Sequence, residues 1–481
     1  MQISHLLENF RIIMGKHIKI IVRVGIFLIL TALSNISPIF SQSERDALYV
    51  KEIYNQTLLN GKCYDWLKVL SEDIGGRLAG STEAEKAVNY TYDLMKTIGF
   101  EHITKQECAV KKWSRGNKEE VYIYREGEER VEIPALTLGN SVGTDGSEVL
   151  GEVIELRAID SLEAFGEEMI RDKIVFFNRP MDPTQLRTFH AYGGAVDQRV
   201  HGAAQAVKFG AKAVLVRSLT TLQDDYPHTG VTVYEEDGKK IPTLAISTNA
   251  ANNLSDLLST QRVTVGVKSY AQNLGAGISY NVIGEITGSE KPEEIILVGG
   301  HLDSWDIGGG AHDDGAGCVH ALQAIHTLLA MGYKPKHTIR CIMFMNEENG
   351  LAGGLKYAKE SNDKNEFHLA AIESDAGGFT PRGFSCDAEA DKFNVLYKAL
   401  TKFNPILEAY DLRFVKGGSG ADINPLKSQG GLLIGFRPDS QRYFDYHHSA
   451  KDRIEAVNER ELKLGAAAIS SLIYLIDKYG L

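Results

Sequence analysis

The 481-residue sequence predicts an α/β protein, a mixed sheet with helices on both faces that carries a smaller inserted α+β module. From about residue 280 onwards, short apolar runs typical of buried strands alternate with segments of helical periodicity. Residues 121–267 differ, because several short strand-like runs there flank one clear helix. The chain is also longer than a single compact core needs, which favours a domain inserted in another.

The first 42 residues are predicted to be a secretory signal peptide. Basic residues precede an apolar run at residues 24–33, and small and polar residues follow it. That run is about half of the ~20 residues that a membrane-spanning helix needs. We therefore expect an exported protein, secreted or periplasmic. Residues 39–41 do not form an A-x-A cleavage site, so an uncleaved membrane anchor stays open as the alternative.

Residues 43–120 are expected to begin the larger domain. Apolar residues at helical spacing predict helices over most of residues 43–97. A glycine-rich turn at residues 73–80 interrupts them, and a simple connection explains it as well as a binding loop does.

Residues 121–267 are expected to form the inserted module. Its predicted strands and helices cover residues 173–177, 199–209, 213–216, 241–246 and 250–258. The module contains His190, His201 and His228, but it has no H-x-x-x-H, H-x-D or carboxylate cluster. We therefore expect these histidines to face solvent or to be satisfied in the core rather than to bind a metal.

Residues 268–481 are expected to complete the larger domain by strand–helix alternation. The predicted strands cover residues 294–298, 338–345, 369–373 and 432–436, and the predicted helices cover residues 315–330, 350–360, 391–403 and 459–478. The run at residues 294–298 is apolar throughout, as a parallel strand covered on both faces requires.

The residues that follow these strands carry the chemistry. In an open α/β sheet, functional groups gather beyond the carboxyl ends of the strands. Those positions supply acidic and imidazole side chains with almost no lysine or arginine: His301, Asp303, Asp313, Glu347, Glu348, Asp375, His447 and His448. Carboxylates gathered in this way repel one another unless a cation lies among them, so the pattern predicts a metal site.

The ligand types favour zinc, because histidine is mixed with carboxylate rather than carboxylate alone. The ligands outnumber the three or so that one catalytic zinc takes, which favours two metals about 3.5–4 Å apart with a shared carboxylate. In the adjacent pair Glu347-Glu348, one carboxylate would bind metal and the other would take a proton from metal-activated water. Asp303, two residues after His301, is expected to hold the second nitrogen of that imidazole.

As an ordered set, these segments resemble the signatures of the co-catalytic zinc aminopeptidase family: H-L-D-S-W-D, G-A-H-D-D-G-A-G, F-M-N-E-E-N-G, E-S-D-A-G-G and H-H-S-A-K-D. The resemblance extends over roughly residues 43–481. It implies a phosphorylase/hydrolase-like catalytic domain, with residues 121–267 as a protease-associated domain. It also implies two Zn²⁺ per chain, a homodimer, and hydrolysis of dipeptides or of the N-terminal residues of short peptides.

The same resemblance assigns roles residue by residue. It gives His301 and Asp375 to one zinc, Glu348 and His448 to the other, and Asp313 to both as the bridge. It makes Glu347 the general base, while Asp303 would orient a ligand.

The sequence departs from the family pattern next to these ligands. Several members have a tyrosine directly before the last zinc histidine, where it polarises the scissile carbonyl, and here that position is His447. The residue that contacts the oxyanion is therefore open among His447, Tyr446 and Tyr443. Of the two adjacent histidines, His448 is the preferred ligand because it immediately precedes an S-x-x-D pattern. His312 stands where relatives often have asparagine, and the sequence offers no account of it.

Charge and cysteine usage exclude other classes. The net charge of −11 argues against a nucleic-acid partner, because no segment concentrates positive charge for phosphate. Five cysteines without regular spacing do not make a disulfide framework. Whether any bridge forms is left open, and Cys63 with Cys108 is the favoured pair. Cys318 and Cys341 are expected to be buried free thiols.

An exported zinc exopeptidase is the leading interpretation, and two others stay open. One is a single-zinc acyltransferase resembling glutaminyl cyclases, which the metal stoichiometry would distinguish. The other is a non-catalytic binding module on the same fold. Such modules tend to lose ligands, whereas this sequence keeps all five together with Glu347.

Overall fold

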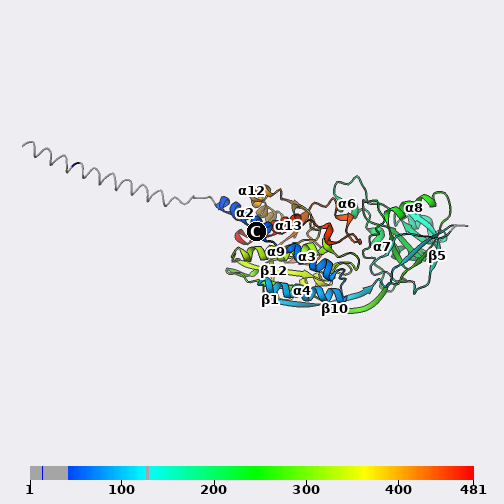
Figure 1. The fold of residues 1–481 in the computed structure, drawn as a ribbon, viewed down its shortest axis with the longest axis horizontal. Helices are drawn as coiled ribbons and strands as arrows, with labels where there is room; N and C mark the ends of the chain where they lie inside the picture. Colours follow the sequence, from blue (N-terminus) through cyan, green and yellow to red (C-terminus); the bar gives the residue numbers. More distant parts are fainter. Residues whose placement is uncertain (1–13, 15–41, 126–128) are drawn as a thin grey trace, which may run out of the picture. The chain divides into compact units, whose positions relative to one another are not determined.

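In the computed structural model, the described residues are Met14, 42–125 and 129–481 (Figure 1). The chain divides into two units, Met1–Lys51 and Glu52–Leu481. Within the first unit, the description covers Met14 and the beginning of helix α2 (Gln42–Asn60), so nearly all of the predicted signal peptide lies outside the described residues. Over the described ranges, no helix is long and apolar enough to cross a membrane.

The second unit contains a mixed sheet with the strand order β1-β10-β12-β11-β13-β16-β14-β15. Strands β12, β11, β13 and β16 are parallel neighbours at its centre, whereas β1, β10 and β14 pair antiparallel. The strands are β1 (Glu101–Ser114), β10 (Gln272–Ile286), β11 (Lys291–His301), β12 (His337–Phe344), β13 (Phe367–Glu373), β14 (Pro381–Asp387), β15 (Arg413–Lys416) and β16 (Leu432–Pro438). The predicted α/β class with a mixed sheet is confirmed.

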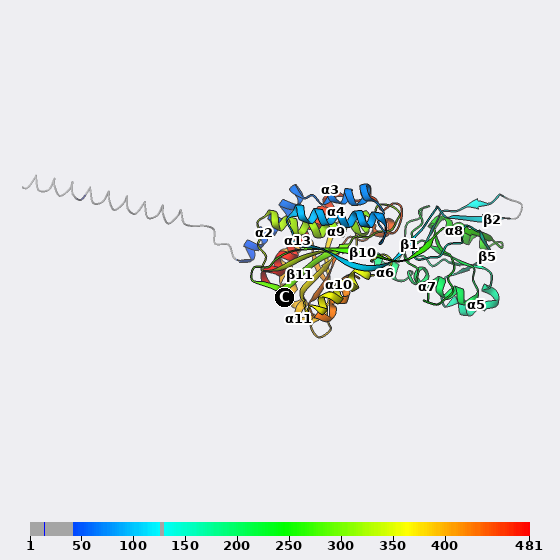
Figure 2. The same cartoon turned by 90° about the horizontal axis from the view of Figure 1, so that it is seen from below.

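Helices cover both faces of this sheet (Figure 2). On one side lie α3 (Cys63–Lys68), α4 (Thr82–Ile98), α9 (Ala316–Ala330) and α13 (Glu459–Tyr479), and on the other α10 (Ala352–Asp363) and α11 (Phe393–Leu400). Helix α9 is buried almost all round because it packs between β11 and α13. The predicted helices at residues 315–330, 350–360 and 459–478 are therefore confirmed.

Strand β11 shows why its predicted run is apolar throughout. Ile295 and Leu297 pack in one cluster with Tyr357 of α10. Ile296 and Val298, which alternate with them and point to the other face, are buried as well. Both faces of the strand are therefore covered, as in a buried parallel sheet, and its parallel register with β12 and β13 brings their carboxyl ends to one edge.

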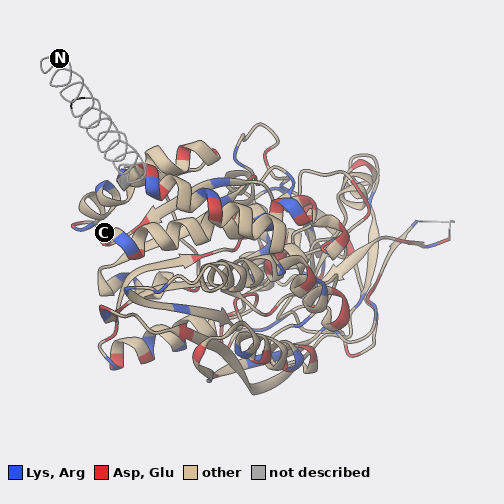
Figure 3. Ribbon diagram, turned by 60° about the vertical axis from the view of Figure 1, so that its left-hand side comes forward, with Lys and Arg blue, Asp and Glu red and all other residues tan. Residues whose placement is uncertain are grey.

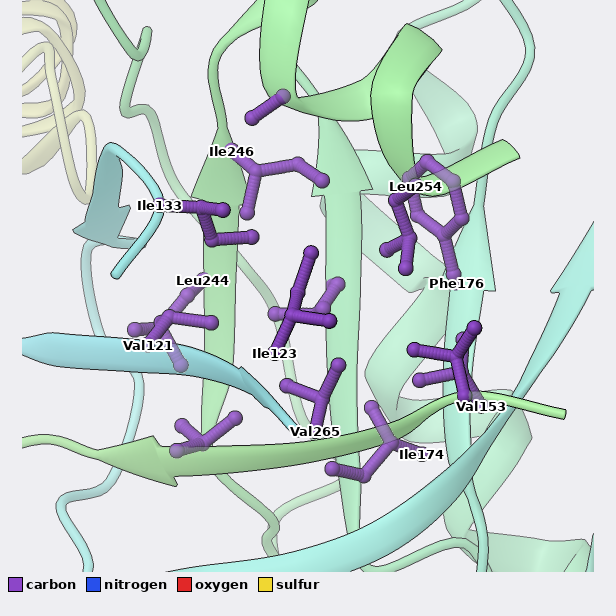
Figure 4. Packing of buried hydrophobic residues seen from close by; sticks show 14 of the residues in the cluster. Val121, Ile123, Ile133, Val153, Ile174, Phe176, Leu244, Ile246, Leu254 and Val265 are labelled. Carbon is purple, nitrogen blue, oxygen red and sulfur yellow. The ribbon is translucent and has the colours of Figure 1, made fainter. Parts of the chain in front are cut away.

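A second sheet is formed from the chain between β1 and β10, with the order β3-β2-β9-β5-β6-β7-β8-β4. Its strands are β2 (Glu120–Tyr124), β3 (Val131–Glu132), β4 (Ala135–Thr137), β5 (Val149–Leu156), β6 (Ile174–Phe177), β7 (Ala213–Arg217), β8 (Thr243–Ile246) and β9 (Thr264–Lys268), and its helices are α5 (Ser161–Ile170), α6 (Thr188–Gly193), α7 (Asp197–Ala206) and α8 (Thr248–Leu258). Val121, Val265 and Leu254 belong to one of its cores, where strand side chains pack under α8 (Figure 4).

Two features differ from the sequence expectations. Strands β1 and β10 pair along almost their whole length, yet neither was predicted, because much of each strand is exposed and lacks an apolar run. The favoured Cys63–Cys108 bridge was wrong: all five cysteines are free and buried. Cys63 lies in α3 and Cys108 in β1, where each fills a core position. The expectation of buried free thiols at Cys318 and Cys341 is confirmed.

Acidic and basic residues are interspersed along the ribbon in the view of Figure 3. Many of the ion pairs join exposed neighbours on one helix, such as Lys359 with Asp363. Pairs of that kind contribute little to stability and mainly keep the surface solvated.

Candidate metal centre

The carboxyl ends of the central parallel strands bring the predicted site residues to one edge of the sheet. His301 is the last residue of β11, and it pairs in register with Phe344 at the end of β12. Glu347 and Glu348 follow β12, and Asp375 follows β13. Asp313 lies in the turn η3 (Ala311–Gly315) between β11 and α9, and the loop after β16 carries His447 and His448.

Asp313 lies between two groups of side chains. Its Oδ1 is 3.3 Å from His301 Nε2, and that same nitrogen is 3.5 Å from Asp375 Oδ1. On the other side, Asp313 Oδ2 is 3.2 Å from His448 Nε2, which is 3.1 Å from Glu348 Oε2. One carboxylate thus has an oxygen toward each of two imidazole–carboxylate pairs.

His447 and His448 compete for the second group, since both have a ligand atom within 4.8 Å of Asp313. The two rings stack at 3.5 Å between centroids. His447 Nε2 is 3.8 Å from Asp313 Oδ2, whereas His448 Nε2 is 3.2 Å from Asp313 Oδ2 and 3.1 Å from Glu348 Oε2. The geometry therefore favours His448 as the ligand in this group.

The protonation of these groups reflects the excess of carboxylate. Burial alone would lower the pKa of His301, but hydrogen bonds to Asp313 and Asp375 outweigh it and hold that pKa well above 6.5. Burial likewise opposes protonation of His448, yet Glu348 and Asp313 raise its pKa to about 10. The negative charge of the surrounding carboxylates thus stabilises the protonated form of both imidazoles.

The donor set fits zinc. Glu348 Oε1 is buried and has no hydrogen-bond partner among the described residues, and Asp313 Oδ2 is buried with the imidazole of His448 at 3.2 Å as its neighbour. Buried carboxylate oxygens of that kind are costly unless a cation or a donor satisfies them. Imidazole nitrogens and carboxylate oxygens are the ligands that zinc accepts, and the arrangement around Asp313 offers such ligands on both of its sides.

Asp303 acts differently from the sequence expectation. The Nδ1–H of His301 donates to the backbone carbonyl of Asp303 at 2.9 Å, whereas the Asp303 carboxylate is 3.9 Å from that nitrogen. Its carboxylate instead accepts hydrogen bonds from the backbone N–H groups of Asn346 at 2.6 Å, Glu347 at 3.1 Å and Glu348 at 3.4 Å. Asp303 therefore orients His301 through its carbonyl and holds the Glu347-Glu348 turn through its side chain.

The carboxylate of Glu347 is not engaged by a described residue. It is partly buried and lines the adjoining cavity, and no hydrogen bond from a described residue to its side chain is found. Burial raises its pKa well above 4.5, and the nearby carboxylates of Asp375 and Glu348 raise it further, against the effect of His301. A carboxylate with a raised pKa that faces a cavity is suited to exchange a proton.

His312 has a structural explanation that the sequence lacked. Its ring stacks on Phe379 at 4.2 Å and lies 5.3 Å from Tyr446. Its Nδ1 accepts a hydrogen bond from Gly378 N–H at 3.1 Å, and its Nε2–H donates to the carbonyl of Ala456 at 3.3 Å. The imidazole of His312 therefore links the turn before Asp313 to the loops that contain Gly378 and Ala456.

The second sheet supplies contacts to the histidine loop that the sequence did not indicate. His228 Nδ1–H donates to the carbonyl of His447 at 2.6 Å, and Thr229 N–H donates to the carbonyl of His448 at 2.8 Å. The ring of His448 lies 3.3 Å from the carbonyl of Thr229 and 3.5 Å from Arg199. Among the three histidines predicted to be bystanders, His190 and His201 are exposed, as expected, but His228 is buried beside the site, and its Nε2 has no partner among described residues.

A cavity of about 870 Å³ opens onto these residues. Residues of both sheets line it, including Arg199 and Tyr234 from the second sheet's segment and Glu347 from the first. Of the three candidates for the oxyanion contact, Tyr443 and His447 line this cavity. Tyr446 does not appear in its lining, and its ring packs toward His312 and Phe379.

The protonation of the two cavity-lining candidates also differs. Burial, and then the charge of Asp313, holds the pKa of Tyr443 well above 10, so its hydroxyl keeps its proton and remains a donor. Burial and the neighbouring His448 hold the pKa of His447 well below 6.5, so that imidazole is neutral.

Comparison with known proteins places this geometry in context. The model of peptidase family M28 matches residues 281–473. Carboxypeptidase Q from Bos taurus is 31% identical over 431 residues, which cover 89% of this chain and 88% of that protein. Carboxypeptidase Q from Homo sapiens is 30% identical over 417 residues, covering 86% of this chain and 85% of that protein.

Solved structures agree with these matches. A peptidase M28 precursor from Shewanella amazonensis SB2B superposes with a TM-score of 0.84 at 29% identity, over 90% of this chain and 96% of that chain. A zinc aminopeptidase from Bacillus subtilis superposes with a TM-score of 0.62 at 19% identity, over 86% of this chain and 94% of that chain. At the latter identity, the likeness concerns the fold alone.

Proposed function

The chain belongs to peptidase family M28 and is a metallo-exopeptidase, and on that premise we propose that it is an exported di-zinc enzyme that hydrolyses dipeptides or the N-terminal residues of short peptides. The observation that carries the proposal is the position of Asp313, with one oxygen near His301 and the other near His448. A carboxylate in that position is what a pair of metals with a shared ligand requires.

We assign His301 and Asp375 to one zinc, Glu348 and His448 to the other, and Asp313 to both. The contacts of 3.1–3.5 Å among these side chains support the assignment, as does the unpartnered Oε1 of Glu348. Zinc bound there would act as a Lewis acid toward the scissile carbonyl and would lower the pKa of water.

Glu347 is proposed to be the general base. Its free carboxylate faces the cavity, so it can accept a proton from the attacking water and pass it to the leaving amine once the C–N bond breaks. Asp303 fixes the base by accepting the backbone N–H groups of the Glu347 turn. The Tyr443 hydroxyl, which stays protonated, is the favoured donor to the developing oxyanion, with His447 as the alternative.

A dipeptide reconciles the names of the relatives. Those relatives are called carboxypeptidase, and several solved neighbours are called aminopeptidase. The single peptide bond of a dipeptide adjoins both a free amine and a free carboxylate, so one activity satisfies both descriptions. The acidic surroundings of Asp313 suit a free α-amino group.

We further propose that residues 121–267 form a protease-associated domain, that the chain is a homodimer, and that residues 1–42 direct export. Support for the first comes from the second sheet, whose strands span Glu120–Lys268 and whose segment lines the cavity. Export rests on the order of basic, apolar and small residues at the N-terminus, and dimerisation rests on the family resemblance.

The direct test is a panel of unmodified dipeptides and aminoacyl amides, incubated with the purified protein after chelation and again after zinc is restored. Zinc-dependent release of free amino acids is the expected result. A protein that binds zinc fully but releases no amino acid from any member of the panel would contradict the proposal.

A further inference from the structure

A second cavity adjoins the metal centre and is not explained by the reaction itself. It has a volume of about 470 Å³, and Phe189 and Asp375 line both this cavity and the larger one. Because Asp375 is a proposed zinc ligand, a peptide held at the metals has direct access to this second space.

The walls of this cavity come from the first sheet with its loops and from the segment between β6 and β7. Its floor is the end of β16 with the neighbouring glycine-rich loop at residues 418–420, and its side is the segment at residues 186–190. That side is held in place, because Gln441 Nε2 donates to the carbonyl of Leu186 at 2.8 Å and the Thr188 hydroxyl donates to the carbonyl of Ser440 at 2.9 Å. The cavity therefore has a defined shape rather than being a gap beside a free loop.

Three arginines line the cavity, and they differ in how they are paired. Arg382 is engaged, since its guanidinium lies 3.2 Å from Asp411 and 3.0 Å from Asp439. For Arg187 and Arg437, no side-chain hydrogen bond or ion pair to a described residue is found, although both line the cavity wall. Burial, and then the positive charge of Arg187, lowers the pKa of Arg437, so the two guanidiniums act on each other within the same space.

The strand register places Arg437 near the metal centre. Gly435 of β16 pairs with Glu373 of β13, two residues before Asp375. Arg437 lies two residues further along β16 on the same face, a step of roughly 7 Å along the strand. An arginine at that position can reach a group on a small substrate whose backbone is held at the metals.

Arg437 is half-buried, so its unpaired guanidinium favours an anionic partner, and the exposed Arg187 adds positive charge to the same cavity. Taking a cation out of water is costly unless an opposite charge and hydrogen bonds compensate. The planar guanidinium also matches a carboxylate through two parallel N–H···O bonds. Three acidic residues line this cavity, and each has another partner. Asp439 is paired with Arg382, Glu373 accepts the backbone N–H of Ile423 at 2.9 Å, and Asp375 lies 3.5 Å from His301 as a proposed zinc ligand.

We propose that the arginine cavity, defined by Arg187 and Arg437, binds a carboxylate group of the peptide substrate. The inference rests on the proposed peptidase function and adds a substrate class to it, short peptides with a carboxylate within reach of the metals. That carboxylate is either an acidic side chain or the C-terminal group, and the experiment distinguishes the two.

The test compares Arg187→Gln and Arg437→Gln with the matched control Arg382→Gln, whose guanidinium already has protein partners. Each protein is assayed for kcat/KM on Glu-Ala against Gln-Ala, on Ala-Glu against Ala-Gln, and on Ala-Ala against its C-terminal amide. In Arg187→Gln and Arg437→Gln, a hydrogen bond between charged groups is lost. The value of kcat/KM should fall by about 10- to 100-fold for the peptide that carries the bound carboxylate and stay nearly unchanged for the neutral peptide of the same pair. Arg382→Gln should preserve the ratio.

The pair of substrates that responds identifies the source of the carboxylate. Discrimination of Glu from Gln points to a side chain, whereas discrimination of the free acid from the amide points to the terminus. If all peptides are cleaved and the arginine variants change every kcat/KM equally, the inference is overturned while the proposed function stands. If no peptide is cleaved, the proposed function fails. Calorimetry with the zinc-loaded protein then measures how tightly the same peptides bind. Equal affinity for Glu and Gln peptides, together with equal affinity for the free C-terminal acid and the C-terminal amide, would refute the inference.

Discussion

Glu347 and Glu348 are adjacent in the chain, yet their carboxylates have different surroundings. Glu348 is buried with Oε2 3.1 Å from His448 Nε2, and burial together with Asp313 raises its pKa to about 7. The Glu347 carboxylate is turned to the cavity and is not engaged by a described residue. Because a turn places consecutive side chains in different directions, adjacent residues of one type can serve a metal and a proton.

Replacing Glu347 by Gln should abolish hydrolysis and leave the metal content and the fold unchanged. The substitution removes a base but no proposed ligand, and the loss of a general base typically lowers the rate by ~10²–10⁴. Turnover of a dipeptide and elemental analysis of the same preparation measure both effects.

The matched variant is Glu348→Gln, which should reduce zinc occupancy as well as turnover. Both variants should give the same far-ultraviolet circular dichroism as the wild type. If Glu347→Gln loses zinc while Glu348→Gln retains it, the roles within the pair are reversed.

His368 is a buried histidine far from the metal ligands along β13, and it should make stability depend on pH. Its Nε2 accepts a hydrogen bond from the Tyr357 hydroxyl at 2.7 Å, and its Nδ1–H donates to Gln429 at 2.8 Å. Burial lowers its pKa from 6.5 to about 4. Between these values the unfolded chain binds more protons, so the contribution of His368 is complete above pH 6.5 and is lost as the pH falls toward 4.

The free energy of unfolding should therefore fall by about 2 kcal/mol more in the wild type than in His368→Gln between pH 7 and pH 5. Urea denaturation at fixed zinc concentration measures the difference, and other buried histidines cancel because both proteins contain them. The exposed His201 provides the control substitution, which should behave as the wild type does. Parallel pH profiles for wild type and His368→Gln would contradict this assignment.

At the scale of elements, the loop between β16 and α13 is held from several directions. The Asp452 carboxylate accepts the backbone N–H groups of His312 at 2.7 Å and Asp313 at 3.1 Å, which joins this loop to the turn η3. From the second sheet, His228 and Thr229 bond to the carbonyls of His447 and His448. His448 has a φ of 60°, an uncommon conformation for a residue other than glycine, and these bonds offset its cost.

Replacing His228 by Ala should weaken zinc binding without removing a ligand. The loop would lose the hydrogen bond at the carbonyl of His447, the residue next to the proposed ligand His448. Removing a group that positions a metal ligand typically costs about 10- to 100-fold in metal affinity or activity. Competition with a chelator measures the affinity, and the melting temperature of the zinc-free protein checks the fold. His201 is exposed and lies in the same inserted segment, so His201→Ala should bind zinc as the wild type does. If His201→Ala weakened zinc binding as much as His228→Ala, the loss would not come from the hydrogen bond of His228.

At the scale of the whole molecule, the ligand set predicts close to two zinc ions per chain. Asp313 contacts an imidazole on each side, so Asp313→Ala should lower the content of both sites rather than of one. Elemental analysis after reconstitution and removal of free metal gives the stoichiometry. A value near one for the wild type would contradict the di-zinc proposal and would favour the single-zinc acyltransferase alternative.

The larger cavity, beside the metal centre, predicts a limit on the length of the substrate. Residues from the segments of both sheets line the space of about 870 Å³ beside the metal centre, so a bound peptide has walls on both sides. Dipeptides with a free amino group should be cleaved, their N-acetylated forms should be much poorer substrates, and folded proteins should remain intact. Equal turnover of free and acetylated dipeptides would show that the amine is not recognised, and internal cuts in a long unstructured peptide, seen by mass spectrometry, would exclude an exopeptidase cleft.

The sequence by itself determined the α/β class, most of the central strands and helices, and the residues that meet around Asp313. These features are local: the apolar run of β11 and the helical periodicity of α9 and α13 are written in consecutive residues. The site residues follow from the same logic, because parallel strands end at one edge and their next residues must gather there.

Only the tertiary structure decided the features that join distant parts of the chain. Strands β1 and β10 are held by pairing to each other rather than by apolar periodicity, and the Asp303 carboxylate turns to the Glu347 turn instead of to His301. His228 reaches His447 over a sequence separation of 219 residues, and Arg187 joins Arg437 in one cavity. The first two contacts depend on how distant segments of one sheet meet, and the last two on how segments of the two sheets pack. Packing over long separations leaves no periodic signal in the sequence.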